Sequence, residues 1–191
     1  MGNTQSERTM PYALEFLGKN TDEITKQATQ ILGVLVNLPE YDRKDRKGGI
    51  LTLMGLRGSF LVGFAIGEVP KNDPAKYYEI ACKKCRLLHN LHYNDHFSDE
   101  KEKPPISSFV RRNEKYEIYG GGIPLGTFYS SDPCKYNCGF LAFSGLPELA
   151  DEALVLVLAL DMEWIKLDLA REIAQASTNP YFEALLKASR A

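Results

Sequence analysis

Apolar side chains recur at helical spacing soon after the start of the chain. Residues 20–23 (Asn-Thr-Asp-Glu) are typical of a helix start, with Asn20 as the cap and Glu23 at the capping-box position. The apolar residues that follow are three or four positions apart: Ile24, Ala28, Ile31, Leu35 and Leu38. This spacing predicts an amphipathic helix that Pro39 ends. Residues 1–19 are predicted to form a flexible N-terminal tail.

In the middle of the chain, apolar runs alternate with turn signals. Residues 50–54 and 60–66 are apolar runs on either side of Gly58, a pattern that predicts a β-hairpin. A helix is predicted from residues 72–74 (Asn-Asp-Pro) to about Leu91, since proline is tolerated in the first helical turn. Residues 98–105 are charged and end in two prolines, which predicts a surface loop.

The last part of the chain predicts two strands followed by helices. Residues 116–125 favour a strand with a bulge at its three glycines, and residues 140–143 favour a short buried strand. A helix in two pieces is predicted from Pro147 to about Ala176, and a short helix from Tyr181. Strands that arrive through hairpins favour an antiparallel sheet covered by helices, so we expect one α+β domain over residues 20–191.

Composition and charge narrow the classes of function. The chain has 191 residues, of which 44% are hydrophobic and 25% charged, as in a single globular domain. The net charge is −2, and aromatic and basic residues do not alternate along the chain. The sequence therefore does not predict a nucleic-acid-binding protein. The longest apolar run, residues 153–160, is far shorter than the roughly 20 residues of a membrane helix, so no membrane span is expected.

The N-terminal residues allow a prediction of the cellular compartment. They are polar and lack the apolar stretch of a secretory signal, so we expect a cytoplasmic protein. Residues 1–6 (Met-Gly-Asn-Thr-Gln-Ser) also match the short myristoylation pattern, with Gly2 as the acceptor. A single acyl chain without a basic cluster anchors a protein only weakly, so a solvated tail is the favoured interpretation.

The apolar run at residues 153–160 allows a prediction of the oligomeric state. A helix that is apolar all round must be covered on more than one face. One sheet of this chain covers one side, so the other side is expected to meet a second copy, which predicts a homo-oligomer. The alternative is that the helix from Tyr181 covers it within the same chain.

Two segments of the second half resemble the GlcG/HbpS-like family. They read Tyr-Gly-Gly-Gly-Ile-Pro-Leu at 119–125 and Cys-Gly-Phe-Leu-Ala-Phe-Ser-Gly-Leu-Pro at 138–147, and Asp151 and Glu152 follow. The family signature is a glycine run before an Ile-Pro strand, then a strand ending in Ser-Gly and an acidic helix start. Residues 81–85 (Ala-Cys-Lys-Lys-Cys) stand where the family has an Ala-Lys-Ala helix. The departures are Cys85, the long connection at 128–137 and the lack of an acidic residue on the first hairpin strand.

The resemblance implies a fold and a ligand. The fold is a three-layer α/β/α sandwich around a central antiparallel sheet of about five strands, with frequent oligomerisation. The implied function is binding of a small molecule, which is haem or another tetrapyrrole in some members, and haem degradation follows from the resemblance alone. A divergent branch of the family is an equal alternative. The alternative function is that of an oligomeric scaffold with the same fold, which binds protein partners and no small molecule.

The glycine run supplies the first candidate ligand-binding residues, Gly120, Gly121 and Gly122. Backbone amides that carry no side chains can approach an anion closely. The alternative is a bulged strand packed tightly against a helix. Neither a P-loop nor a dinucleotide fingerprint fits, because no Gly-Lys-Ser/Thr and no helix follows the glycines.

The four cysteines are weak candidates for a metal site. Cys82, Cys85, Cys134 and Cys138 could together offer four thiolates to zinc. The alternative is that Cys82 and Cys85 lie in the core, since they share a helix face with Ala81 and Leu88. A covalent haem motif is excluded because arginine, not histidine, follows Cys85.

All three histidines lie on the same predicted helix or just after it. His89, His92 and His96 continue the stripe of Cys82 and Cys85, at helical spacing. Asn94 and Asp95 favour the end of the helix before His96, so His89 and His92 are the candidate ligands of haem iron or a metal ion. The alternative is a polar helix end.

No catalytic set is predicted. Ser144 lacks the flanking glycines of a hydrolase elbow and is better explained as a strand-to-helix turn. No carboxylate pair, Cys-His dyad or phosphate loop stands out. The sequence therefore favours a ligand-binding protein over an enzyme.

Overall fold

The predicted hairpin forms half of an antiparallel sheet. The computed structural model describes residues 6–55, 61–71, 73–94, 107–125 and 139–191. In it β1 (Lys47–Met54) pairs with β2 (Leu61–Glu68), while Gly58 and residues 98–105 lie outside the described ranges. β4 (Gly139–Ser144) pairs with the other side of β1, and β3 (Gly122–Leu125) pairs with β4. The strand order is β2-β1-β4-β3.

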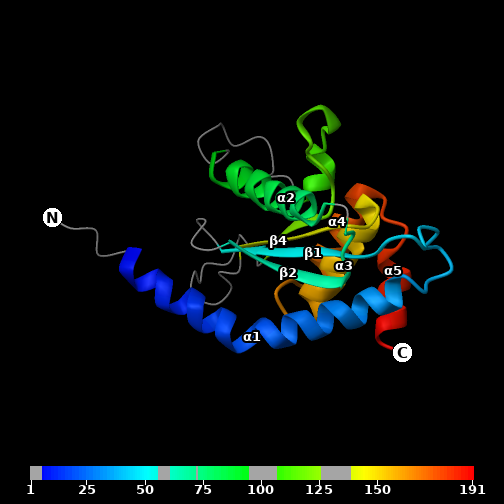
Figure 1. The fold of residues 1–191 in the computed structure, drawn as a ribbon, viewed down its shortest axis with the longest axis horizontal. Helices are drawn as coiled ribbons and strands as arrows, with labels where there is room; N and C mark the ends of the chain where they lie inside the picture. Colours follow the sequence, from blue (N-terminus) through cyan, green and yellow to red (C-terminus); the bar gives the residue numbers. More distant parts are fainter. Residues whose placement is uncertain (1–5, 56–60, 72, 95–106, 126–138) are drawn as a thin grey trace.

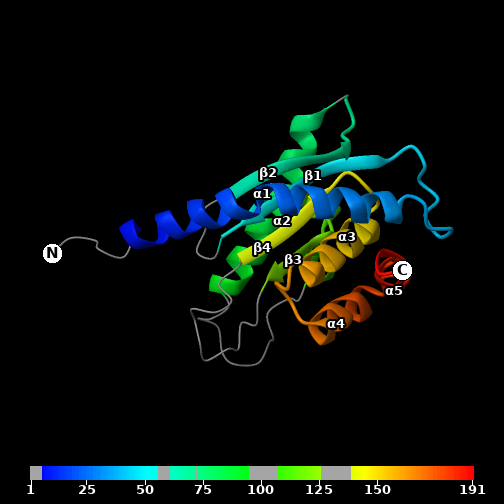
Figure 2. The same ribbon diagram turned by 90° about the horizontal axis from the view of Figure 1, so that it is seen from below.

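Helices lie on both faces of this sheet, as Figure 1 shows. α2 (Pro74–Asn94) packs on one face, across β1 and β4. α1 (Ser6–Leu35) and α3 (Glu148–Asp161) pack on the other face. α4 (Leu167–Ser177) and α5 (Phe182–Ser189) contact α3, and Figure 2 shows both of them beside it. The fold class is therefore mixed helix and sheet, as predicted.

The strands divide the apolar side chains between these two faces. Successive side chains of a strand point to opposite faces of the sheet. Leu51 and Leu53 accordingly join the large core beneath α1 and α3, whereas Met54 joins Cys85 and Phe140 in a small core beneath α2. Thr52, also on the α2 side, is fully buried and lies 3.4 Å from the Cys85 sulfur through its Oγ1.

Most of the predicted elements are confirmed. The predicted apolar stripe of the first helix is buried at every position, from Ile24 to Leu38. The second helix begins at Pro74 and extends three residues beyond the predicted end at Leu91. The helix from Pro147 does divide in two, and Asn179-Pro180 separates the second piece from the last helix.

Two predicted boundaries are wrong. α1 begins at Ser6 and runs through Asn20, so the capping pattern at residues 20–23 starts no helix. A cap is a local preference, and residues on its N-terminal side that favour helix, such as Ala13, Leu14 and Glu15, override it. Likewise, the predicted strand over residues 116–125 is only the strand β3, because η4 (Glu114–Tyr116) and the left-handed Glu117 turn the chain before it.

The apolar helix α3 is covered within one chain. Residues 150–159 are all buried, by α1, α4, α5 and the sheet together. The alternative that the C-terminal helix covers this run is therefore correct, and the run gives no reason to expect a second subunit. None of the described helices is long and apolar enough to cross a membrane.

Truncation of the α5 side chain that covers α3 should be costly. Leu185 is fully buried in the large core, so Leu185→Ala is expected to lower the free energy of unfolding by about 2–5 kcal/mol. Lys187→Ala, on the exposed side of the same helix, should leave it nearly unchanged. Urea denaturation of both variants tests this, and equal effects would show that α5 does not cover α3.

Candidate functional site

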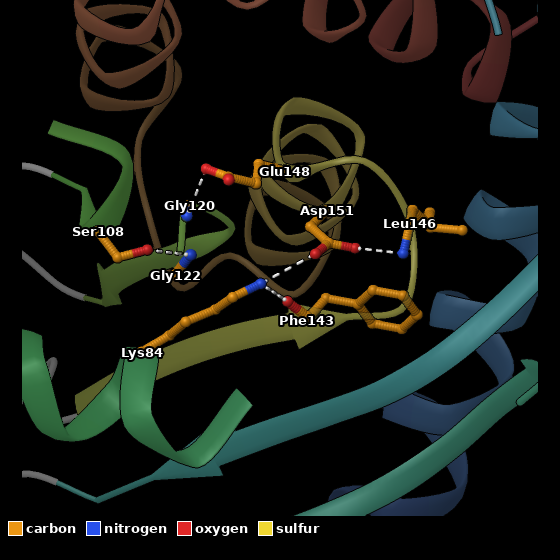
Figure 3. Close-up of polar contacts among 8 residues, drawn as sticks. All are labelled: Lys84, Ser108, Gly120, Gly122, Phe143, Leu146, Glu148 and Asp151. Atoms are coloured by element: carbon orange, nitrogen blue, oxygen red, sulfur yellow. Dashed lines mark hydrogen bonds and ion pairs between the residues drawn. The ribbon is translucent and has the colours of Figure 1, made fainter. Parts of the chain in front are cut away.

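A buried lysine on α2 and a buried aspartate on α3 form the polar centre of the molecule. The Lys84 Nζ lies 2.9 Å from the Asp151 Oδ2, and the two side chains are only 2% and 3% exposed. Lys84 also donates to the carbonyl oxygen of Phe143 on β4, at 2.5 Å. Figure 3 shows this ammonium group between the end of β4 and the start of α3. One side chain thus joins α2, β4 and α3.

The aspartate is held from both sides. Its Oδ1 accepts a hydrogen bond from the backbone N–H of Leu146 at 2.9 Å, in the turn that leads from β4 into α3. Burial raises the pKa of Asp151 to about 7, although Lys84 and the Leu146 amide act in the opposite direction. Asp151 therefore accepts a proton far more readily than an exposed aspartate does.

The glycine run lies directly beside this ion pair. Gly121 has a φ of +97°, and a Cβ added to it would collide with the Asp151 side chain and come within 3.0 Å of the Lys84 Nζ. The Gly120 N–H donates to the Glu148 carboxylate at 2.8 Å, and the Gly122 N–H donates to the Ser108 Oγ at 2.9 Å. The amides of Gly120 and Gly122 are thus directed at protein side chains, as the alternative of a tightly packed segment expects.

A second buried carboxylate, Glu152, links α3 to the C-terminal helices. Ser177 donates to it through its hydroxyl, and Asn179 donates to its Oε1 at 3.1 Å. Burial raises the pKa of Glu152, and these two hydrogen bonds lower it. These hydrogen bonds join the first half of α3 to the end of α4.

A cleft opens beside the ion pair. It has a volume of about 580 Å³, within the usual range for a small-molecule site. Its described lining includes the turn at residues 144–147, two tyrosines (Tyr77, Tyr119), three cationic residues (Arg46, Lys76, Lys84) and three acidic residues (Asp73, Glu148, Asp151). The cleft thus combines apolar and aromatic surface with charges of both signs, and Lys84 and Asp151 contribute its most deeply buried charges.

Two of the four cysteines can be placed, and both lie in the core. Cys82 is 3% exposed and Cys85 is fully buried, which confirms the core alternative for this pair. Burial raises the pKa of the Cys85 thiol to about 12, so it remains protonated and is a poor metal ligand. Cys134 and Cys138 lie outside the described residues. Among the residues that the structure does describe, no cluster of three or more His, Cys, Asp or Glu side chains could hold a metal ion.

Of the two predicted histidine ligands, the structure describes the side chain of His89 but not that of His92. His89 is half-buried, and its ring packs edge-on against Phe140 with centroids 5.9 Å apart. Its Nδ1 lies 3.4 Å from the side-chain oxygen of Asn90, and His89 is not among the residues that line the cleft. The side chain of His92, like all of His96, lies outside the described part of the chain. The structure therefore does not bring His89 together with the glycine run.

The sequence analysis did not single out Lys84, Glu148, Tyr77, Tyr119 or Arg46. For Lys84 a signal was present, because position 84 falls on the helix face of Ala81, Cys85 and Leu88, where a lysine is out of place. Asp151 entered only through the family resemblance. No such pattern marks the other four residues, because a single sequence does not distinguish a cleft-lining residue from an exposed residue of the same type.

Removal of the lysine should destabilise the protein in a pH-dependent way. The pKa of folded Asp151, about 7, lies above the ordinary value of 3.8, so its contribution to stability is present at low pH and lost as the pH rises. Lys84→Met removes the cation that lowers the pKa of Asp151, so this pKa rises further. The variant therefore continues to lose stability above pH ~7, where the wild type no longer does. We expect the deficit of the variant to grow between about pH 6 and pH 9, toward ~3–5 kcal/mol.

The matched control is the neighbouring lysine. Lys83 forms an ion pair with Glu117 in which both side chains are exposed, by 42% and 55%. Lys83→Met should therefore leave stability nearly unchanged at every pH. Urea denaturation of both variants across this range gives the comparison, and parallel curves for wild type and Lys84→Met would contradict the expected dependence.

The close approach of Gly121 predicts a second effect. Gly121→Ala places a Cβ against Asp151 and strains the backbone, so we expect a loss of more than about 2 kcal/mol and a disrupted ion pair. Gly33→Ala, on α1 with nothing within 4 Å of the new methyl group, should instead stabilise the protein by up to about 1 kcal/mol. Thermal denaturation distinguishes the two, and a tolerated Gly121→Ala would show that the glycine is not required here.

Comparison of the chain with protein-family models, with curated proteins and with solved structures found no match. The GlcG/HbpS-like resemblance therefore rests on the sequence segments alone. What the structure contributes is the cleft and the Lys84–Asp151 pair beside it.

Proposed function

We propose that this protein binds a small organic anion in the cleft beside the Lys84–Asp151 pair. The observation that carries the proposal is the composition of the cleft, in which two tyrosines and two cations less buried than Lys84, Arg46 and Lys76, line one space of about 580 Å³. Ligand sites are typically concave and largely apolar, with a few polar groups that fix orientation. The structure of the lining therefore suits a planar or apolar body that carries a carboxylate.

The chemistry of each cleft residue supports this ligand class. Arg46 offers a planar guanidinium that matches a carboxylate in two hydrogen bonds, and Lys76 adds a point charge. Tyr77 and Tyr119 offer ring faces and phenol groups to a planar ligand. Buried Lys84 and Asp151 neutralise one another, and Asp73 and Glu148 balance the charges of Arg46 and Lys76. The ligand carboxylate would therefore be held by direct contact with Arg46 or Lys76, not by a net positive charge of the cleft.

Haem or another tetrapyrrole, which the resemblance implies, belongs to this ligand class because it is planar and carries carboxylates. Of the described cleft residues, Tyr77 and Tyr119 could supply an axial oxygen to iron, and Arg46 and Lys76 could hold the carboxylates. His89 lies away from this lining. We therefore propose phenolate rather than imidazole ligation if the ligand is haem.

The wider predictions about the chain also stay proposals. Helices on both faces of the sheet support a three-layer sandwich, and the described residues contribute four strands to it. A single domain over residues 20–191 and a cytoplasmic location remain expectations of the sequence, and a homo-oligomer remains an expectation of the family resemblance alone.

Binding should depend on the cleft arginine. Titration of the protein with benzene-1,4-dicarboxylate, protoporphyrin and haem, followed by NMR and absorption spectra, should show saturable binding of at least one probe. Arg46→Gln should weaken it about ten-fold or more, because a charge-assisted hydrogen bond is lost. Arg43→Gln is the control, since Arg43 pairs with Asp45 and does not line the cleft.

The outcomes separate the hypotheses. An equal loss in both arginine variants would show that the cleft is not the binding site. No binding of any probe would contradict the proposal and favour the protein-interaction scaffold. A shifted haem spectrum that Tyr77→Phe and Tyr119→Phe leave unchanged would contradict phenolate ligation.

A further inference from the structure

The primary amine of Lys84 contributes to the cleft wall although its side chain is almost wholly buried. The side chain is 2% exposed and is one of the groups that line the cleft. We propose that Lys84 forms an imine with a carbonyl compound that also carries a carboxylate, so that the cleft binds such ligands covalently and reversibly. This inference rests on the proposed function, since the ligand must first enter the same cleft.

Imine formation requires a primary amine and is favoured where that amine is withdrawn from water. Of the three cleft cations, Lys84 combines both properties. Arg46 carries a guanidinium group, which is not a primary amine and forms no imine. Lys76 is exposed, so its ammonium group is fully hydrated. Only Lys84 is withdrawn from water, and lysines that form Schiff bases are typically desolvated in this way.

Asp151 is placed to move the proton that the reaction requires. Its Oδ2 lies 2.9 Å from the Lys84 Nζ, while its other oxygen is held by the Leu146 N–H, so the carboxylate is fixed with one oxygen toward the amine (Figure 3). Burial also raises the pKa of this carboxyl to about 7, which lets it take up and return a proton near neutral pH.

The step balances without any further reactant. A proton passes from the ammonium group to Asp151, and the free amine attacks the carbonyl carbon of the ligand. The C–N bond forms as the C=O π bond breaks, and the oxygen receives the proton that Asp151 returns. The oxygen of the resulting carbinolamine leaves as water with one of the two protons that the nitrogen still carries. The C=N bond forms as a protonated imine, whose positive charge is balanced by the Asp151 carboxylate. Nothing is oxidised or reduced, and hydrolysis reverses the step.

The lining restricts the carbonyl compounds that can react. Arg46 and Lys76 favour a ligand with a carboxylate, and Tyr77 and Tyr119 favour a flat ligand body. An aromatic aldehyde that bears a carboxylate is the simplest member of this class. 4-Formylbenzoate is therefore a suitable probe, and benzene-1,4-dicarboxylate is its counterpart without a reactive carbonyl group.

Reductive trapping tests the inference on the full chain. The protein is incubated with 4-formylbenzoate and cyanoborohydride, and intact-mass spectra are recorded. One adduct per chain should form, with the mass of the probe less one oxygen atom, and peptide mapping should place it on Lys84. The neighbouring Lys83, which is exposed, is the internal control because a non-selective reaction would modify it first. An excess of benzene-1,4-dicarboxylate should suppress the adduct.

Two variants refine the test. Lys84→Arg keeps the positive charge and should abolish the adduct while circular dichroism shows an intact fold. Asp151→Asn keeps the size of the side chain and should slow trapping about ten-fold or more, with loss of its pH dependence near neutrality. The mapping on wild-type protein needs neither variant to fold.

The results distinguish this inference from the proposed function. Binding of benzene-1,4-dicarboxylate together with adducts confined to Lys76, Lys83 and other exposed lysines would overturn the imine and leave the proposed function standing. Absence of binding by either probe would overturn both. An adduct on Lys84 that the dicarboxylate does not suppress would show that the amine reacts without the anion site, which contradicts the proposed ligand class.

Discussion

The ion pair between Lys84 and Asp151 is the interaction on which the rest of the site depends. A buried charge without a partner is strongly destabilising, so each of these groups requires the other. Lys84 extends from α2 to the end of β4 and the start of α3, so the pair also fixes how these three elements meet. The cleft lies along this junction, and its shape follows from the same contacts.

The backbone around the pair is adapted to it. Gly121 passes so close to Asp151 that no side chain fits, and the turn before α3 directs the Leu146 amide at the carboxylate. The amides of Gly120 and Gly122 are bound by Glu148 and Ser108. The glycine run is thus explained first by the packing of the ion pair, and the cleft beside it offers side chains rather than free amides to a ligand.

Most of the fold was predictable because hydrophobic spacing reflects burial directly. The stripe from Ile24 to Leu35, the hairpin and the divided helix after Pro147 all depend on local patterns, and the structure contains them. The helix start at Asn20 failed because capping is a weak preference that neighbouring residues override.

The candidate site was much less predictable. Lys84 and Asp151 meet through the tertiary fold alone, and each looks like an ordinary charged surface residue in the sequence. The lysine on the buried face of Ala81 and Leu88 was the only local sign of it. The oligomer inferred from residues 153–160 rested on an apolar surface that α4 and α5 cover within the same chain, a long-range contact that spacing cannot reveal.

The buried pair also has a consequence for how this chain can change in evolution. Lys84 and Asp151 are 67 positions apart, on different helices, yet a substitution at one leaves an uncompensated charge at the other. A single mutation at either position is therefore penalised, whereas a double replacement by two apolar residues of matching volume is tolerated. We therefore expect descendants of this sequence to keep both charges or to lose both together.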